Sequence, residues 1–216
     1  MPVATPTPRA RRREANLRRI LDTAMRQVVA DGFGSFSMHK LARAVDYTPG
    51  ALYRYFPSKE AILQALIVKV IEALGERVAN QATGEPLEVI RRLCRVYQRF
   101  ALEQPEQFGL LAMLLADPRV VLASDDVARP AVAAMLDALR PLREAFADAV
   151  ESGALAAGDP ELRALTTFSA LHGVLSLRKQ AALAPDSIDL ARMTNELLDT
   201  LLRGWGAEEA IEEGAR

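Results

Sequence analysis

The sequence is poor in cysteine, since Cys94 is the only one among 216 residues. A single thiol excludes an intramolecular disulfide and any metal site built from cysteine pairs. Cys94 lies in an apolar helical pattern, where a buried and unreactive thiol is the common case. Histidine is also scarce, and neither His39 nor His172 follows a glutamate at the three-residue spacing that di-iron helical bundles use. We therefore expect no metal and no cofactor.

Long hydrophobic runs are missing too, although half of the residues are hydrophobic. No apolar stretch reaches the roughly 20 residues that a transmembrane helix needs. The basic start, MPVATPTPRARRR, is not followed by the apolar segment of a signal peptide. We expect a cytoplasmic protein with no membrane partner.

Enzyme signatures are absent as well. The chain has no P-loop and no His-Glu-x-x-His motif, and Ser37 stands where a nucleotide-binding glycine fingerprint requires its third glycine. A helical enzyme is therefore the weakest of the alternatives that the sequence leaves open.

The charge is divided unevenly along the chain, although the net charge is only −1. Residues 1–60 hold eleven Lys or Arg against five Asp or Glu, a net +6, and the remainder carries a net −7. A basic head on an acidic body indicates a polyanion-binding module joined to a part with another task.

Apolar residues recur at helical spacing throughout, and no convincing alternating strand is found. We predict an all-α fold of about nine helices, in which an N-terminal three-helix helix-turn-helix domain precedes a C-terminal helical bundle. The expected parts are a disordered basic arm (1–12), the helix-turn-helix domain (13–58), the body (59–206) and a flexible tail (207–216). One long helix is expected from Pro160 to about Ala182.

Residues 31–60 carry the clearest pattern. A helix over about 37–45 is followed by a turn at Asp46-Tyr47 and by a short helix over 49–55. Thr48 is expected to cap this short helix, with Pro49 at its first position. The helix is too short to bury a core, and small residues at its start suit close approach to another surface. The sequence therefore predicts a DNA-binding surface.

The head resembles the TetR family of one-component transcriptional regulators, of the TetR/AcrR type, over roughly residues 14–66. The matching residues are Gly32-Phe33, Ser37, Leu41-Ala42, Thr48, Gly50, Leu52-Tyr53, Tyr55-Phe56 and Lys59-Glu60. The body resembles a C-terminal subtype of that family more loosely, at Tyr97–Ala101, Pro105-Glu106, Phe108, Ala170–Gly173 and Ser176-Leu177.

The turn departs from the family pattern. Asp46 stands where the family usually has glycine, and Asp tolerates a left-handed backbone better than most residues. Tyr47 replaces a small aliphatic residue, and it either fills the same hole or points at DNA.

The resemblance implies that the short helix enters the major groove of operator DNA. Ala51 suits a thymine methyl group and Arg54 suits guanine or a phosphate, while the arginines of the arm suit an adjacent minor groove. Plain capping, core packing or a solvated surface are the alternatives for each residue. The expected DNA-binding residues are Arg12, Arg13, Ser37, Thr48, Pro49, Ala51, Tyr53, Arg54, Tyr55 and Lys59.

One short recognition helix reads few base pairs, so a twofold homodimer is expected, with heads about 34–36 Å apart or at a larger helical repeat. The alternative is that the same residues only complete the core of one subunit. The expected dimer interface comprises Phe168, Leu171, Val174, Leu175, Met193, Leu197, Leu201 and Trp205.

By the same resemblance the body should hold a pocket for an unknown small apolar ligand. Here, too, ordinary core packing is the alternative. The expected pocket residues are Tyr97, Phe100, Leu110, Met113, Leu114, Met135, Phe146, Phe168 and His172. We predict a nucleoid-associated repressor that such a ligand releases from a palindromic operator. The alternative is a DNA-binding regulator without a small-molecule ligand, either architectural or protein-partnered.

Overall fold

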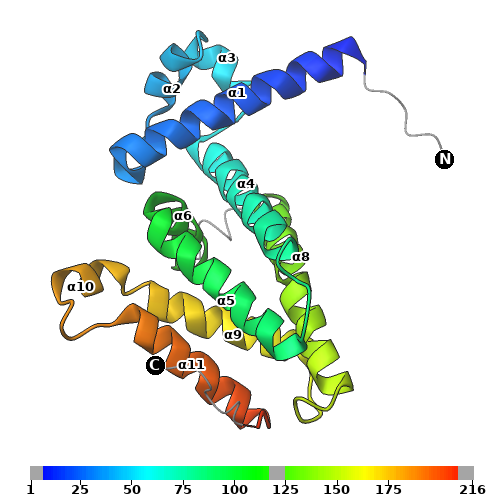
Figure 1. Cartoon of the computed structure of the whole chain (residues 1–216). Helices are drawn as coiled ribbons and strands as arrows, with labels where there is room; N and C mark the ends of the chain where they lie inside the picture. Colours follow the sequence, from blue (N-terminus) through cyan, green and yellow to red (C-terminus); the bar gives the residue numbers. More distant parts are fainter. Residues whose placement is uncertain (1–6, 117–124, 209–216) are drawn as a thin grey trace. The chain divides into compact units, whose positions relative to one another are not determined.

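The computed structural model describes residues 7–116 and 125–208, and within them all side chains except those of Phe33, 113–116 and 125–128. These residues form ten α-helices and one short 3-10 helix, so the all-α prediction is confirmed (Figure 1). The chain divides into two compact units, one made of 1–70 with 106–132 and the other of 71–105 with 133–216. Among the described residues, no helix is long and apolar enough to cross a bilayer.

The first unit contains the head. Its helices are α1 (Pro8–Asp31), the 3-10 helix η1 (Phe33–Ser35), α2 (Met38–Ala44), α3 (Pro49–Tyr53), the first part of α4 (Lys59–Ala79), nearly all of α6 (Pro105–Ala116) and the start of α8 (Asp125–Glu151). In Figure 1, α2 and α3 lie on the same side of α1. The fully buried side chains that hold this unit together include Ile20, Leu41, Leu52, Ile62, Leu66, Ile67, Phe108 and Leu110.

Helix α1 begins earlier than the sequence suggested. Thr7 caps it, since its hydroxyl accepts a hydrogen bond from the Ala10 N–H at 3.2 Å, and Pro8 occupies the first position. Residues 8–12 are therefore helical, which corrects the prediction of a disordered arm over that stretch. The helix ends at Asp31, and Gly32 follows it with φ 74° and an N–H that bonds to the Val28 carbonyl.

The turn between α2 and α3 keeps a left-handed residue without a glycine. Asp46 has φ 58°, the one positive φ outside glycine among the described residues. Thr48 then caps α3 by accepting a hydrogen bond from the Ala51 N–H at 3.2 Å. The helix ends at Tyr53, two residues before the predicted end, because the Tyr55 N–H bonds to the Leu52 carbonyl and tightens the last turn.

The second unit holds the rest of α4, α5 (Pro86–Glu103), most of α8 (Asp125–Glu151), α9 (Pro160–Leu175), α10 (Arg178–Leu183) and α11 (Leu190–Gly204). Helices α9 and α11 lie side by side (Figure 1). Gly75 of α4 permits a close approach to α8, since a Cβ there would lie 3.2 Å from that of Ala138. Buried residues of this unit include Ile90, Leu93, Phe100, Phe146, Leu171, Leu175, Leu198 and Leu202.

The prediction of a single helix from Pro160 to about Ala182 is wrong, because helix α9 ends at Leu175. The Ser176 hydroxyl and N–H both donate to the His172 carbonyl, at 2.8 and 2.9 Å. A serine hydroxyl that bonds to the backbone in this way competes with the regular helical pattern. The short helix α10 follows.

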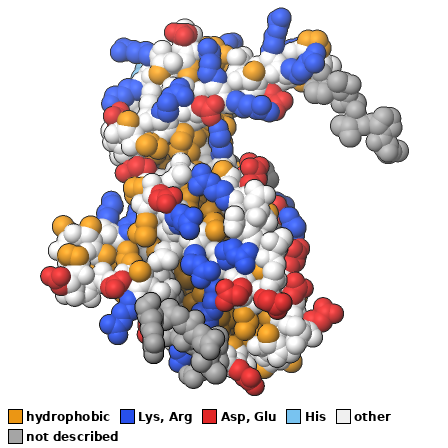
Figure 2. All heavy atoms as spheres, in the orientation of Figure 1, with side chains coloured by type: hydrophobic (Ala, Val, Ile, Leu, Met, Phe, Trp, Pro, Cys, Tyr) orange, Lys and Arg blue, Asp and Glu red, His pale blue; other side chains and the backbone are white. Residues whose placement is uncertain are grey.

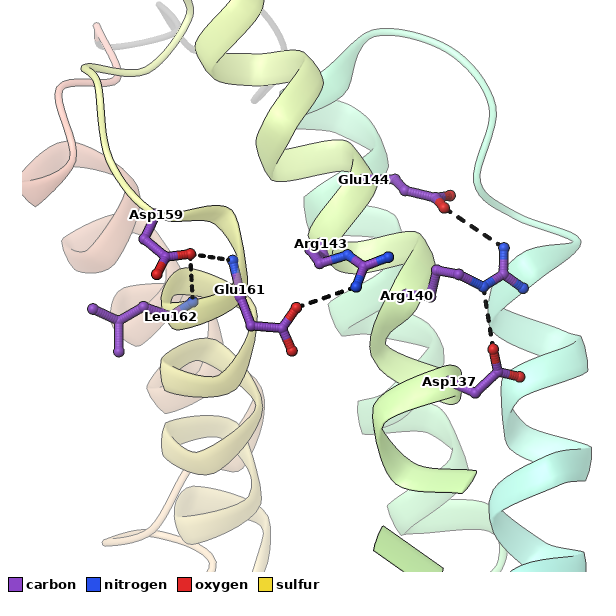
Figure 3. A network of polar contacts seen from close by, with 7 residues as sticks. All are labelled: Asp137, Arg140, Arg143, Glu144, Asp159, Glu161 and Leu162. Carbon is purple, nitrogen blue, oxygen red and sulfur yellow. Dashed lines mark hydrogen bonds and ion pairs between the residues drawn. The ribbon is translucent and has the colours of Figure 1, made fainter. Parts of the chain in front are cut away.

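Polar contacts connect α8 with α9 in this unit (Figure 3). Asp159 caps α9 by accepting hydrogen bonds from the N–H groups of Glu161 and Leu162. Arg143 of α8 forms an ion pair with Glu161 at 3.2 Å. Arg140 forms ion pairs within its own helix, with Asp137 and Glu144. These groups are about half exposed, and exposed pairs of this kind add little stability.

Candidate nucleic-acid interface

Helix α3 turns one face inward and offers the other to solvent. Leu52 is fully buried and Phe56, four residues later, is 7% exposed, whereas Tyr53 is 45% exposed and Arg54 is also exposed. No atom lies within 4 Å of the place where a Cβ would stand on Gly50. The beginning of the helix is thus open to close approach by a large partner.

Basic side chains lie on the same unit. Arg12 and Arg13 are exposed in the first turns of α1. Figure 2 shows Lys and Arg side chains across the visible face of the unit, with a few Asp and Glu among them. A surface of this charge attracts a polyanion such as a nucleic-acid backbone.

Four of the expected DNA-binding residues lie at helix starts, and Pro49 is the first residue of α3. Thr48 caps α3, as predicted, while Ser37 occupies the N-cap position of α2 but makes no capping hydrogen bond within the described structure. Lys59 is the first residue of α4, and its ammonium lies 5.8 Å from the centre of the Phe36 ring. Helix N-termini favour anions because their first N–H groups have no partner within the helix.

Tyr55 has a different environment from Tyr53. It is half-buried, and its ring stacks on that of Tyr47, with centroids 5.7 Å apart and ring planes 8° apart. Its hydroxyl accepts a hydrogen bond from Asn16 Nδ2 at 3.2 Å. Arg19 lies over the Tyr47 ring at 5.5 Å and donates to the Val45 carbonyl at 2.9 Å. Tyr47 is therefore part of the contact between α1 and the end of α3.

The sequence reading missed Asn16 and Arg19. They are three positions apart on α1, so they lie on the same face of the helix, next to the apolar stripe that packs inward. That spacing is the signal by which the pair could have been found.

The second unit brings together four of the expected pocket residues. The Tyr97 hydroxyl lies 2.6 Å from His172 Nδ1, and Phe168 packs against both rings, with centroids 5.5 and 5.9 Å away. Phe100 lies 6.3 Å from the Tyr97 ring. We call these four residues the aromatic group.

Burial fixes the protonation states in the aromatic group. It raises the pKa of Tyr97 above its ordinary value. It lowers the pKa of His172, and the nearby Arg178 charge lowers that pKa further. Both groups are therefore neutral near pH 7, so Tyr97 and His172 share a hydrogen bond between uncharged partners.

Comparison with known proteins identifies the family. Residues 20–66 match the model of bacterial regulatory proteins of the tetR family, and residues 90–201, just over half of the chain, match the tetracyclin repressor-like C-terminal domain. The chain belongs to the TetR family. It is thus a DNA-binding transcriptional regulator of a family whose members are not enzymes.

Individual relatives of this TetR-family chain are distant. The HTH-type transcriptional regulator UidR of Escherichia coli K12 is 32% identical over 118 residues, which are 55% of each protein. The chain thus matches about half the length of this curated relative.

Two solved structures have the same fold. Thermus thermophilus FadR in complex with lauroyl-CoA has a TM-score of 0.62 at 26% identity, and the match covers 92% of this chain and all of that one. RolR in complex with resorcinol has a TM-score of 0.67 at 21% identity, covering 92% and 91%.

The other expected pocket residues of this TetR-family chain belong to α6 and α8. Leu110 is buried in the first unit, Met135 is partly exposed on α8, and Phe146 packs edge-on against Trp205. The side chains of Met113 and Leu114 lie outside the described residues.

The expected dimer residues of α9 and α11 divide by exposure. Leu171 and Leu175 are buried within one chain, at 2% and 0% exposed, so they have little surface left for a partner and belong to the core. Trp205 packs against Phe146 and Arg163 of its own chain. The partly exposed members are Phe168, Val174, Met193, Leu197 and Leu201.

Cys94 is buried in α5, and burial raises the pKa of its thiol to about 12. It lines a small hollow among α5, α9 and α11, together with Arg91, Arg95 and Leu198. The cavity volume is about 30 Å³, which is room for a water molecule or two rather than for a ligand.

Proposed function

We propose that the chain is a cytoplasmic, homodimeric repressor that leaves a palindromic operator when a small, largely apolar ligand binds the body. The DNA-reading residues are those of the open face of α3, led by Tyr53 and Arg54, with phosphate contacts from the helix starts at Ser37, Thr48, Pro49 and Lys59. Arg12 and Arg13 extend this contact along α1. The observation that carries the proposal is the exposure of a five-residue helix whose inner face is anchored by Leu52.

A dimer is supported by exposed apolar residues on α9 and α11. Met193, Leu197 and Leu201 recur every four residues and so share one face of α11, and all three are partly exposed. On α9, Leu162 is 63% exposed, and Gly173 leaves open space at its Cβ position. Apolar surface of this kind is buried by an identical surface in a twofold interface.

A ligand response is supported by the aromatic group. Apolar walls with one or two polar groups are the usual composition of a small-molecule site, and Tyr97 with His172 supplies an uncharged polar pair beside Phe100 and Phe168. Two proteins of the same fold, RolR and Thermus thermophilus FadR, are seen in complex with resorcinol and lauroyl-CoA. We infer a ligand with an apolar body and one hydrogen-bonding group.

The release mechanism is a shift between two conformations of the dimer. A ligand that binds better to the state with wrongly spaced heads lowers operator affinity by the ratio of its affinities for the two states. The alternative is a regulator without a ligand. The hollow beside Cys94 is too small to hold a ligand, and this favours the alternative for that part of the body.

Selection of bound sites from a pool of random duplexes, with the full-length protein, tests the proposal. We expect a palindrome whose half-sites lie one or more helical turns apart. The selection is then repeated in the presence of apolar acids, phenols or acyl thioesters. We expect one of these classes of compound to abolish the enrichment of the palindrome. If compounds that raise the melting temperature leave operator affinity unchanged, the ligand-free alternative holds.

A further inference from the structure

Helix α1 begins well before the residues that pack into the head. Ile20 is the first buried residue along it, and residues 7–15 are all exposed. In Figure 1, this beginning of the helix extends past α2 and α3. The helix forms there for local reasons, because Thr7 caps it, Pro8 occupies its first position, and arginine and alanine are strong helix formers. About two turns of α1 therefore stand clear of the packed head.

Three arginines of this exposed stretch share one side of the helix. Arg9, Arg12 and Arg13 precede Asn16 by seven, four and three positions, and residues at these spacings lie on the same side of a helix. Asn16 donates to the Tyr55 hydroxyl at 3.2 Å, so this side of α1 is the one that meets the end of α3. We call Arg9, Arg12 and Arg13 the arginine face.

The opposite side of the same stretch has different chemistry. Arg11, Glu14 and Arg18 lie there by the same spacings, and Glu14 forms an ion pair with Arg18. The ion pairs of the described residues leave the arginine face without an acidic partner. Cations are also unfavourable in the first turns of a helix, because the helix dipole is positive there. The arginine face thus concentrates positive charge that no described carboxylate neutralises.

The end of α3 continues this positive surface. Arg54 is exposed there, and it directly precedes Tyr55, to which Asn16 of α1 is hydrogen-bonded. A duplex that contacts the open face of α3 therefore comes close to the arginine face as well. Its backbone carries one phosphate charge in every 3.4 Å of each strand, which is the complement that the unpaired arginines lack.

The helical conformation decides which part of the duplex these arginines reach. A helix with its side chains is about 10–12 Å across, whereas the minor groove is about 6 Å wide. Residues 8–14 are thus too wide to enter the minor groove as a helix, and phosphate oxygens are the acceptors outside it. Arg9 and Arg13 are about 6 Å apart along the helix axis, enough to span two phosphates.

We propose that the arginine face binds the phosphate backbone of the operator beside the half-site that α3 reads, and that the helical conformation of residues 8–14 aims its three side chains. The inference rests on the proposed placement of α3 against DNA. A guanidinium group suits a phosphate because it donates paired hydrogen bonds to two oxygens. Such a contact adds affinity without sequence preference.

Substitutions on the two sides of one helix distinguish this contact from an unstructured basic arm. Full-length wild type, Arg9→Gln, Arg12→Gln, Arg13→Gln and the control Arg11→Gln are titrated with random duplex DNA over a range of salt concentrations. Glutamine removes the charge and remains a good helix former. Each change on the arginine face should weaken binding several-fold and reduce the salt slope by about 1, whereas Arg11→Gln should stay near wild type. Equal losses from all four changes, or no loss from any, overturn the proposal.

A further variant tests the helix without changing the charge. Ala10→Gly keeps all four arginines and puts a poor helix former in the first turns of α1. Circular dichroism should show lower helicity at an unchanged melting temperature. Binding to random duplex should weaken by up to about fivefold, the equilibrium cost of glycine against alanine in a helix. Unchanged affinity despite lost helicity means that an unstructured arm binds as well, and it overturns the role of the helix.

The composition of the duplex separates the backbone from the minor groove. A phosphate contact predicts that Arg12→Gln loses the same factor on A·T-rich and on G·C-rich duplexes. Narrow A-tract grooves attract inserted arginines, so a larger loss on A·T-rich duplexes assigns the side chain to the groove and overturns the proposal. Failure to select any palindrome counts against the repressor proposal. Equal salt slopes for wild type and the arginine-face variants on random duplex count against the present inference alone.

Discussion

The hydroxyl of Tyr97 and Nδ1 of His172 lie 2.6 Å apart although 75 positions separate them in the sequence. The pair connects α5 with α9, and Phe168 covers both rings. A buried polar pair of this kind is stable only while each partner satisfies the other. The body is therefore sensitive to the protonation of His172.

His172→Gln should flatten the dependence of stability on pH. Burial lowers the pKa of His172 in the folded chain, so the unfolded chain takes up the proton first as pH falls below about 6.5. Stability present above that pH is then lost progressively toward the folded pKa. Urea unfolding between pH 7.5 and 5 should show a steeper loss for wild type than for His172→Gln. His39→Gln, which removes an exposed imidazole, should keep the wild-type slope, and identical slopes for all three proteins would contradict this account.

Arg54→Ala should weaken DNA binding without changing stability. The side chain is exposed at the end of α3, and each lost base or phosphate contact costs about 1–3 kcal/mol or lowers the salt slope by about 1. Affinity measured across a salt titration separates these two cases. Arg99→Ala, at an exposed position of α5, removes an equal charge from the body and should leave affinity unchanged. Equal affinity of Arg54→Ala and wild type at every salt concentration would remove Arg54 from the interface.

The features that could be predicted from the sequence depend on neighbouring residues. Two examples are the Thr48 cap, with Pro49 at the first helical position, and the left-handed Asp46. Each rests on hydrogen bonds or torsions within a few positions. Side-chain chemistry decides such features locally. This is why the helical head could be outlined before its structure was known.

What could not be predicted depends on contacts between distant residues. Asn16 and Tyr55 are 39 positions apart, and their hydrogen bond exists only because α1 and α3 pack together. The burial of Leu171 and Leu175 likewise depends on packing between helices. An apolar residue on a helix marks a buried face, but the sequence does not say whether a helix of the same chain or of a partner covers it.

Asp46 allows a direct test of the turn. A residue with a Cβ costs about 1–2 kcal/mol in the left-handed region, and Asp or Asn less. Asp46→Ala should therefore lower the free energy of unfolding by about 1 kcal/mol, whereas Asp46→Asn should stay near wild type. Asp46→Gly should also stay close, because relief of strain offsets its more flexible unfolded chain. Chemical denaturation measures all three, and a harmless Asp46→Ala would mean that the turn relaxes away from φ 58°.

Gly173 offers the sharpest test of the dimer. It is exposed on α9, and a Cβ there would meet no atom within 4 Å in one chain. Gly173→Arg should therefore fold normally as a monomer, with helicity kept or slightly raised because arginine favours helices more than glycine does. In a twofold interface, the added side chain and its charge meet the partner, so light scattering should show dissociation. Binding to a palindrome should then fall by at least tenfold, because one head reads only half a site. Ala147→Arg, on the exposed face of α8, controls for the added charge and should remain dimeric. If Gly173→Arg is as dimeric as that control, this face of α9 does not form the interface.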